Sequence, residues 1–428
     1  MVKAQEYRVT TSKRPKLHFF TDCSYVAGSE RMLINLATSL AITDLYDVTL
    51  SYRYSQHYSD DLAPRIDSEK VNVVPIKGLY PFRAAFKIQS KFARHLVLGI
   101  ETILLKVPLF AYDVAALVRH FWRLKVDLLH VNNGGYPGAY PCSAAVIAAR
   151  LCGVRNIVYV VNNLAVSYGN PARWVDRPID WLVKRWVTQF VTGSRFAADR
   201  LCEVLHLPKQ RAIAIPNGIR MRAIREERAS YLSRASWRTP RPVALIVAQL
   251  EKRKGHIYLL EAMRILVESG REAPLLIIEG VGPERAALEQ YVETNRLSEH
   301  VRFLGSVDHL FDLINAVDFT VLSSIDQEDF PNIVLESMAL GKAVIGTTVA
   351  GIPEQIAHEK TGLLVPPREP NALADALLRL SQNSELRGSL GEQAKEQFTA
   401  RFTENVAVAR YLGLYKSLSV LLRVTPAP

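Results

Sequence analysis

Short apolar segments alternate with longer stretches of helical pattern along the whole chain of 428 residues. This alternation is typical of parallel sheets covered by helices on both faces, whose buried strands read as continuous apolar runs. Thirteen strands are predicted, in two groups. The first group is 17–21, 47–52, 71–76, 126–131, 157–161, 190–192 and 212–215, and the second is 243–248, 275–279, 301–304, 319–322, 343–346 and 362–365.

The two groups of strands are separated by residues 221–242, which are rich in arginine and poor in periodic apolar residues. We therefore predict an α/β fold of two doubly wound domains, 1–220 and 243–383, joined by a linker at 221–242. Helices within 384–428 are expected to cross back onto the first domain. Open sheets of this kind bind ligands at the carboxyl ends of their strands, so the cleft between the domains is the expected site.

Two glutamates, Glu328 and Glu336, follow the predicted strand 319–322. A helix is predicted to begin at Pro331, since proline is favoured at the first helical position, and to end at Gly341. This helix is apolar on nearly every side, so Glu336 is predicted to be buried and to need a partner. Two interpretations stay open: the carboxylate binds the vicinal hydroxyls of a ribose, or it pairs with a neighbouring arginine or lysine. With a diphosphate on the free amides of the helix start, the first interpretation indicates a nucleotide sugar site.

The formal net charge of +11 invites an anionic partner. No nucleic-acid partner is predicted, because the chain has no aromatic-basic ribonucleoprotein run, no paired Cys/His finger and no obvious recognition helix. Residues 82–96 have the pattern of a basic amphipathic helix, with phenylalanines beside four cations. This helix either lies on an anionic membrane or is the solvated face of a helix docked on its own domain. The four cations are Arg83, Lys87, Lys91 and Arg94.

Four cysteines lack the short paired spacing of a zinc site, and no secretory segment opens the chain. A transmembrane helix requires about 20 consecutive residues with few or no charges. No stretch of that length in the chain is free of charge. We therefore expect a reduced, cytoplasmic protein that touches at most the inner face of the membrane. Neither a metal nor another cofactor is expected, since the acidic pair Asp326 and Glu328 alone would hold magnesium poorly.

Several motifs in both halves of the chain match one family. Residues 328–336 contain its Glu-x7-Glu element, 347–354 its glycine-proline-glutamate loop, and 358–365 the segment after it. Residues 247–256 are similar to the strand and loop that hold the donor diphosphate, and 279–285 to the next turn at a strand end. In the first half the similar segments are 27–30, a glycine-rich loop, 127–130, an Asp-x-x-His strand, and 216–218, a Pro-Asn-Gly turn. Together these segments resemble retaining glycosyltransferase family 4, which has the GT-B fold of two Rossmann-like domains.

The resemblance implies a metal-independent enzyme that transfers a sugar, with retention, from a nucleotide sugar. The basic segment 82–96 favours a lipid-linked or polysaccharide acceptor, in cell-surface glycan synthesis. UDP is the expected nucleotide. Glu328 would face the donor sugar near the reacting carbon, Lys254 would neutralise the leaving diphosphate, and Glu336 would bind the ribose. His130 is either a catalytic residue on the acceptor side or a satisfied strand histidine. The other donor-binding residues implied are Gly28, Gln249, Arg253, Pro331, Asn332, Gly351 and Ile352, and those implied on the acceptor side are Asn132, Asn133 and Asn162.

Three positions depart from the family pattern. Gln249 occupies the place of a common arginine, Asn162 that of a frequent histidine, and Ala27 that of the first glycine in the glycine-rich loop. Arg253 or Lys252 would then supply the positive charge that the missing arginine would give to the diphosphate. Asn162 could only hydrogen bond to the substrate. Two other functions therefore stay open: a sugar-nucleotide epimerase on the same fold, and a non-catalytic relative that binds a nucleotide sugar. The run 132–138 either contacts a sugar or forms a structural turn.

Overall fold

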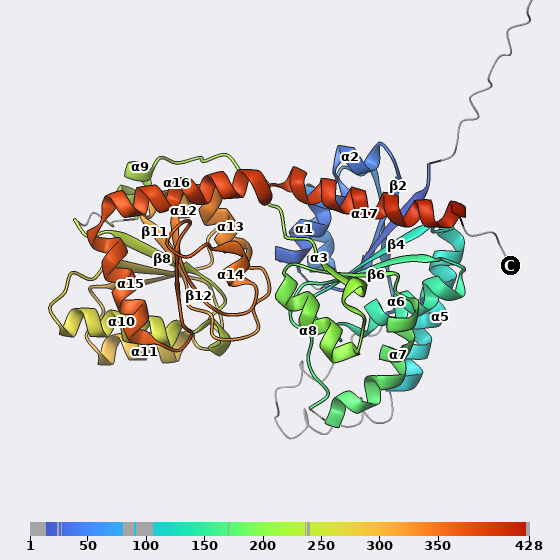
Figure 1. Cartoon of the computed structure of the whole chain (residues 1–428), viewed down its shortest axis with the longest axis horizontal. Helices are drawn as coiled ribbons and strands as arrows, with labels where there is room; N and C mark the ends of the chain where they lie inside the picture. The colour runs from blue at the N-terminus through green and yellow to red at the C-terminus, as the bar shows by residue number, and fades with distance from the viewer. Residues whose placement is uncertain are drawn as a thin grey trace, which may run out of the picture.

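The computed structural model describes residues 14–424, apart from 24, 27, 80–89, 91–105, 170, 236, 238 and 239. Figure 1 shows two α/β bodies side by side, each with helices packed around a central sheet. The predicted basic helix at 82–96 lies outside the described residues except for Ser90, and so does Ala27. Within the described chain, no helix is both long enough and apolar enough to span a bilayer.

The first sheet has seven parallel strands in the order β3-β2-β1-β4-β5-β6-β7. They are β1 (Lys16–Thr21), β2 (Asp47–Arg53), β3 (Val71–Ile76), β4 (Leu128–Asn133), β5 (Asn156–Val161), β6 (Gln189–Thr192) and β7 (Ala212–Ala214). The helices of this half are α1 (Gly28–Ala37), α2 (Leu40–Thr43), α3 (Gln56–Leu62), α5 (Lys106–Leu124), α6 (Tyr140–Leu151), α7 (Arg177–Trp186) and α8 (Arg195–Leu205). Short 3-10 helices are η1 (Ala63–Arg65), η4 (Pro171–Asp176) and η5 (Lys209–Arg211).

The second sheet has six parallel strands in the order β10-β9-β8-β11-β12-β13. They are β8 (Val243–Val247), β9 (Leu275–Glu279), β10 (Val301–Gly305), β11 (Phe319–Leu322), β12 (Ala343–Thr347) and β13 (Leu363–Val365). Its helices are α9 (Arg228–Arg234), η6 (Lys252–Lys254), α10 (His256–Glu268), α11 (Arg285–Thr294), α12 (Leu310–Ala316), α13 (Asn332–Ala339), α14 (Ile352–Gln355) and α15 (Pro370–Gln382).

All thirteen predicted strands are present, with ends that differ from the prediction by two residues or fewer. Continuous apolar runs made them visible: β5, for example, is buried along its whole length. In both sheets the strand order reverses once, between β1 and β4 and between β8 and β11. This is the doubly wound arrangement, so the predicted fold class of two Rossmann-like domains is confirmed.

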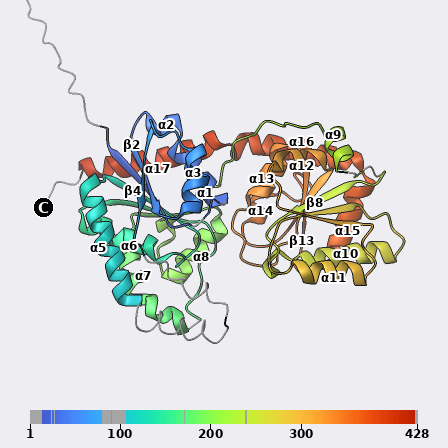
Figure 2. The ribbon, with the colours of Figure 1, turned by 180° about the vertical axis from the view of Figure 1, so that it is seen from behind.

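The last two helices connect the two bodies. Helices α16 (Ser384–Arg401) and α17 (Glu404–Val424) run along one side of the molecule, α16 over the second sheet and α17 over the first (Figures 1 and 2). Helix α17 returns to the first domain, where Tyr415 is buried and Asn156 Nδ2 donates to the Leu418 carbonyl at 3.2 Å.

The predicted linker contains structure of its own. Helix α9 lies within it, and Tyr231 and Trp237 pack against Val243 and Leu245 of β8. Helix α9 and Trp237 thus pack on the second domain. The helix was missed because it has only seven residues, too few for a clear period.

Candidate functional site

The candidate site lies at the switch point of the second sheet. Strands β8 and β11 are neighbours there, and the loops that leave their carboxyl ends carry Lys254 and Glu328. Because parallel strands end at the same edge, the fold brings together two residues that are 74 positions apart in sequence.

Lys254 and Glu328 form a buried ion pair. The Ser324 hydroxyl donates to the same carboxylate oxygen at 2.9 Å, and a guanidinium nitrogen of Arg253 lies 3.8 Å from it. Two cations thus lie around the Glu328 carboxylate, and Arg253 also pairs with Glu251 at 2.7 Å. An ammonium group has three protons to donate, so Lys254 can bind a second anion while it keeps Glu328.

A glycine turn holds Lys254 against the end of β11. Gly255 has φ +68°, and a Cβ there would lie 2.1 Å from the Ser323 carbonyl oxygen. The Ser323 hydroxyl donates to the Lys254 carbonyl at 3.0 Å. Only glycine combines this left-handed conformation with such a close approach, so Gly255 fixes the position of Lys254.

Helix α13 differs from its prediction in two details. Pro331 is the N-cap, with extended backbone at ψ 125°, and Asn332 is the first helical residue. Glu336 is half-buried rather than buried, and the charges of Arg31 in α1 and of Arg222 act on it. Burial raises the pKa of Glu336, and those two arginines act to lower it.

The surroundings of Glu336 leave both sequence interpretations in place. Two arginines are near it, although neither forms an ion pair with it. Within the described part of the chain its carboxylate accepts no hydrogen bond. Its oxygens are therefore available to a ligand. Sequence reasoning did not identify Arg31 or Arg222.

Asparagines connect the two domains at the opening of the site. Asn217 Nδ2 donates to Asn332 Oδ1 at 3.0 Å and to the Phe330 carbonyl at 3.2 Å. Asn332 Nδ2 in turn donates to the Gly28 carbonyl at 3.4 Å. Two of the predicted donor-binding residues, Gly28 and Asn332, thus contact each other across the two domains.

The predicted diphosphate residues Gln249 and Arg253 differ in their surroundings. Gln249 is exposed, and its side chain has no hydrogen-bond partner among the described residues. Arg253 donates to Glu251 at 2.7 Å and to the Gln327 carbonyl at 3.3 Å. Arg253 therefore lies beside the Lys254–Glu328 pair, with a guanidinium nitrogen 3.8 Å from the Glu328 carboxylate.

Two carboxylates of the second domain bind backbone amides of the first. Asp329 accepts from the Gly193 amide at 2.9 Å, and Glu354 accepts from the amides of Arg195 and Phe196, each at 2.9 Å. We call Asp329 and Glu354 the interdomain clamp. Burial raises the pKa of Asp329 to about 6, against the opposing effect of hydrogen bonds from Ser194 and Gly193.

Sequence reasoning missed the role of the clamp. Its signal was weak: Asp329 is a charged residue next to the apolar Phe330, and Glu354 was noted only as part of a loop motif. Neither position reveals a partner in the other domain.

The loop that precedes α14 lies against the same contact. A Cβ on Gly351 would lie 1.9 Å from the Asp329 carbonyl oxygen and 2.6 Å from the Ser194 Cβ, so this loop can approach both domains only with glycine. The Ile352 amide donates to the Val349 carbonyl at 3.0 Å. The amide of Ile352 therefore already has an acceptor in this arrangement.

The three acceptor-side asparagines form one network at the ends of β4 and β5. Asn162 Nδ2 donates to Asn132 Oδ1 at 2.8 Å and to the Asn133 carbonyl at 2.9 Å. Asn132 donates to the buried Glu30 at 2.7 Å. Asn133 donates to the Tyr159 hydroxyl at 2.6 Å and accepts from the Ala139 amide at 3.0 Å, which forms the turn 133–139. Asn162 is the most accessible of the three.

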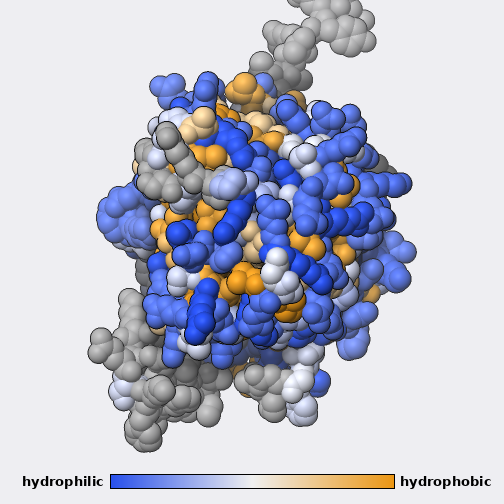
Figure 3. Space-filling model, turned by 90° about the vertical axis from the view of Figure 1, so that its left-hand side faces the viewer, coloured by the Kyte–Doolittle hydropathy of each residue, from blue (hydrophilic) through white to orange (hydrophobic). Residues whose placement is uncertain are grey.

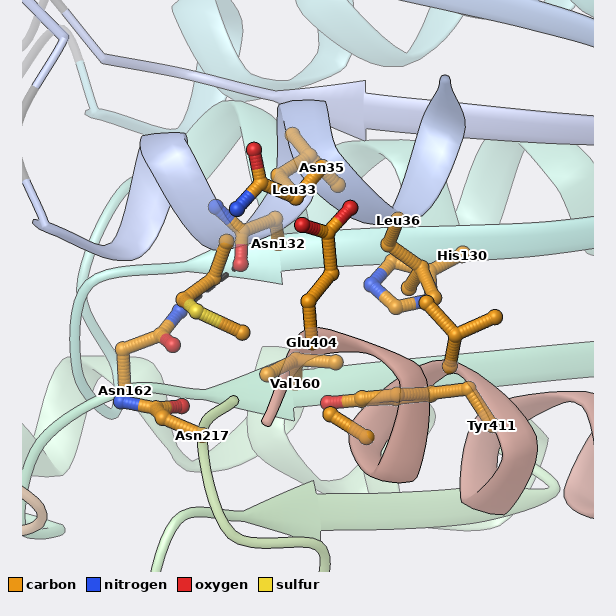
Figure 4. A pocket seen from close by; sticks show the side chains of 13 residues that line it. Leu33, Asn35, Leu36, His130, Asn132, Val160, Asn162, Asn217, Glu404 and Tyr411 are labelled. Carbon is orange, nitrogen blue, oxygen red and sulfur yellow. Dashed lines mark hydrogen bonds between the residues drawn. The ribbon is translucent and has the colours of Figure 1, made fainter. Parts of the chain in front are cut away.

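His130 lies deeper in the first domain. It is buried, and its Nδ1 lies 2.7 Å from the Tyr415 hydroxyl of α17. Burial lowers the pKa of His130 to about 3, so the imidazole is neutral near pH 7. With Asn132, Asn162 and Tyr411 it lines a cavity of about 20 Å³, as Figure 4 shows, which is room for about one water molecule. It has no hydrogen bond to Lys254 or Glu328.

Comparisons with known proteins cover both domains. A family model described as Glycosyltransferase Family 4 matches residues 26–222, and one described as Glycosyl transferases group 1 matches residues 229–397. N-acetyl-alpha-D-glucosaminyl L-malate synthase of Bacillus anthracis is 35% identical over 144 residues, which are 34% of this chain and 37% of that protein. Alpha-D-kanosaminyltransferase of Streptomyces kanamyceticus is 26% identical over 310 residues, 68% of this chain and 77% of that protein.

A third relative is the lipopolysaccharide core biosynthesis glycosyltransferase LpsD of Rhizobium meliloti, 30% identical over 44% of this chain and 53% of its own length. The matched parts therefore span from about a third to about three quarters of these relatives. Among solved structures, Anabaena Alr3699/HepE in complex with UDP superposes with a TM-score of 0.73 over 94% of this chain and 100% of its own, at 18% identity. The same protein has been solved with UDP-glucose.

Proposed function

Because this chain belongs to the group 1 and family 4 glycosyltransferases, with one family model on each domain, we propose that it transfers a sugar from a nucleotide sugar to a glycan or lipid-linked acceptor. The observation that carries the proposal is the buried Lys254–Glu328 pair at the switch point of the second sheet. The ammonium and guanidinium groups of Lys254 and Arg253 at this position suit a substrate that leaves as a diphosphate.

The proposed donor is a UDP-sugar. Support comes from HepE, a protein of the same fold that binds UDP and UDP-glucose. In this chain the diphosphate would bind Lys254 and Arg253, and the ribose would bind the free oxygens of Glu336. Arg31 and Arg222, whose charges reach Glu336, would add positive potential beside the nucleotide.

The proposed reaction retains the configuration of the sugar. The acceptor oxygen forms a bond to the anomeric carbon on the face from which the diphosphate leaves, and the bond from that carbon to the phosphate oxygen breaks. The diphosphate departs with the electron pair and takes the acceptor proton. Lys254 and Arg253 stabilise its growing negative charge, and the Glu328 carboxylate stabilises the positive charge on the ring.

Two cations at the leaving group would do the work of a metal ion, so we propose a metal-independent reaction. The acceptor class rests on the family and on relatives such as LpsD, whose name places it in lipopolysaccharide core synthesis.

Calorimetric titration of UDP, GDP and ADP tests the donor site without knowledge of the acceptor. We expect selective binding of UDP, weakened about tenfold or more in Glu336→Ala, since the variant loses hydrogen bonds to the ribose. Glu293→Ala removes an exposed carboxylate from α11 and is the matched control. Absence of binding by all three nucleotides would refute the donor site.

Turnover tests the catalytic pair. Glu328→Gln should bind UDP within a few-fold of the wild type but release UDP from its UDP-sugar about a hundredfold more slowly, because the charge on Glu328 acts mainly in the transition state. Unchanged turnover would remove Glu328 from the reaction.

A further inference from the structure

A groove of about 610 Å³ opens between the two domains beside the Lys254–Glu328 pair. One of its walls is formed by residues 164–167, in the loop after β5, and by the side of α8 that faces the second domain (Figure 1). The other wall is formed by Asp326 and Gln327, which come directly before Glu328. A molecule bound in this groove would therefore contact both domains next to the proposed reacting centre.

An exposed aromatic ring lies in the first-domain wall of the groove. Phe196 is 49% exposed, and Val166 of the neighbouring loop is 52% exposed. The Phe196 amide donates to Glu354 at 2.9 Å, so the start of α8 is held at the contact between the domains. By contrast, the far end of the second domain, seen in Figure 3, is mostly hydrophilic with scattered apolar residues. The negative face of an aromatic ring attracts the slightly positive C–H groups of a sugar ring, so Phe196 offers a surface on which a sugar can pack.

Charged side chains surround this ring on the same helix. Asp199, Arg200 and Glu203 follow Phe196 by three, four and seven positions, which places them on one face of α8. Arg200 lies 3.5 Å from the Glu203 carboxylate. With Asp326 on the opposite wall, the residues that line the groove carry three carboxylates and one guanidinium group. The lining therefore has an excess of negative charge, and its carboxylates can accept hydrogen bonds from hydroxyl groups.

The groove adjoins the proposed reacting centre and is separate from the proposed ribose site. A guanidinium nitrogen of Arg253 lies 3.8 Å from the Glu328 carboxylate and also donates to the Gln327 carbonyl at 3.3 Å. One arginine thus contacts both the ion pair and the groove wall. Neither Glu336 nor the two arginines whose charges act on it line the groove. A ligand in the groove would therefore leave the ribose site free.

We propose that this groove binds a non-acidic sugar of the acceptor, with the sugar ring on Phe196 and its hydroxyl groups donating to Asp199 and Asp326. The excess of carboxylates repels phosphate groups and uronic acids, whereas one exposed ring with several acceptors around it suits a sugar rich in hydroxyl groups. Because this assignment rests on the proposed glycosyl transfer, it makes the reaction the extension of an existing glycan rather than the first glycosylation of a lipid phosphate.

Saturation-transfer NMR on the full chain tests the groove with methyl glycosides as probes. The neutral probes are the methyl α-glycosides of glucose, galactose, mannose and N-acetylglucosamine, and the acidic probe is the methyl α-glycoside of glucuronic acid. We expect saturation transfer to at least one neutral probe, strongest at its ring C–H protons, and about tenfold less transfer to the acidic probe. The signals should persist at saturating UDP, because the ribose site lies outside the groove.

A change at the aromatic ring tests the packing of the sugar. Phe196→Ser should reduce transfer to the neutral probes roughly fivefold or more, since the sugar loses the ring on which it packs. Trp122→Ser removes a 73% exposed ring from α5 and is the matched control, which should bind as the wild type does. Thermal unfolding midpoints close to the wild type show that each variant is folded.

A change of charge tests the selection against acidic ligands. Asp199→Asn/Glu203→Gln leaves one carboxylate and one guanidinium group in the lining, so transfer to the acidic probe should rise to within about threefold of the neutral probes. Glu392→Gln/Glu396→Gln removes the same charge from exposed positions of α16 and should keep the preference of the wild type.

Four outcomes would overturn the proposal. The wild type shows no transfer to any neutral probe, or UDP abolishes that transfer, which would place the sugar in the donor site. In the other two, Phe196→Ser binds as the wild type does, or the wild type binds the acidic probe as well as the neutral ones.

Calorimetric titration of UDP separates these failures from failure of the proposed function. A wild type that binds UDP but none of the glycosides keeps the donor site and loses the groove. A wild type that binds the glycosides in the groove but none of the nucleotides keeps a sugar site and loses glycosyl transfer.

Discussion

Glu328 and Asp329 are neighbours in sequence, and their carboxylates have opposite surroundings. Glu328 faces the ammonium of Lys254, whereas Asp329 has only the Gly193 amide and Ser194 as donors. Neutral donors do not offset burial as a full charge does, so the pKa of Asp329 is raised to about 6. The charge of Glu354 acts in the same direction. One residue thus pairs with a lysine of its own domain, and the next binds a backbone amide of the first domain.

The raised pKa of Asp329 predicts a dependence of stability on pH. The folded chain binds this proton more tightly than the unfolded chain, so the free energy of unfolding falls as the pH rises from about 4 through about 6. About two pKa units correspond to at most about 3 kcal/mol. Asp329→Asn cannot ionise, and its stability relative to the wild type should improve by about 2 kcal/mol over this range.

Unfolding midpoints measured across this pH range check the prediction for Asp329. Asp326→Asn, three positions away and exposed, is the control and should keep the pH profile of the wild type. If the unfolding midpoints of Asp329→Asn and of the wild type change with pH in the same way, the pKa of the Asp329 carboxyl is not raised in the folded chain.

At the scale of elements, strands could be predicted and contacts between domains could not. A buried parallel strand such as β9 is a continuous apolar run, which is a local property of the sequence. The resemblance assigned Lys254 and Glu328 to the donor site, but their ion pair depends on the strand order, which places the loops after β8 and β11 at one edge. The environment of Glu336 did not follow, since it depends on Arg31 from the other domain.

Helix α8 shows how one element can depend on a distant one. The Ser194 hydroxyl accepts from the Ala197 amide at 3.0 Å, as an N-cap does. The amides of Arg195 and Phe196 have their acceptor in Glu354 of the second domain instead. A helix start has four amides without partners inside the helix, so here two of them are bonded across the interface.

Glu354→Ala should therefore loosen the start of α8 in a position-specific way. We expect hydrogen exchange at the amides of Arg195 and Phe196 to become about fivefold faster, which is the effect of losing a cap worth about 1 kcal/mol. The Ala197 amide keeps its bond to Ser194 and is an internal control. Amide exchange followed by NMR measures all three. Equal acceleration of the three amides would indicate general unfolding, and no change would remove Glu354 from the clamp.

In the whole molecule the two domains contact each other where loops leave the carboxyl ends of both sheets, as between Gly193 and Asp329. Each domain alone carries part of the proposed site, with Lys254 and Glu328 in the second and Gly28 and Asn217 in the first. The clamp and helix α17 hold these parts together, one beside the cleft and the other along the side of the molecule. The distance between the domains therefore depends on how closely the loop at Gly351 can approach.

Gly351→Ala tests whether this approach sets the arrangement of the domains. The added Cβ would lie 1.9 Å from the Asp329 carbonyl oxygen and 2.6 Å from the Ser194 Cβ, so the loop or the domains must move apart. We expect a larger radius of gyration by X-ray scattering and a roughly tenfold or greater loss of turnover, because catalytic groups lose their relative positions. Gly388→Ala in α16 is the matched control: a Cβ there meets nothing within 4 Å, and alanine in a helix interior stabilises by about 1 kcal/mol. A Gly351→Ala variant with the scattering and turnover of the wild type would show that the domains reach their working arrangement without this contact.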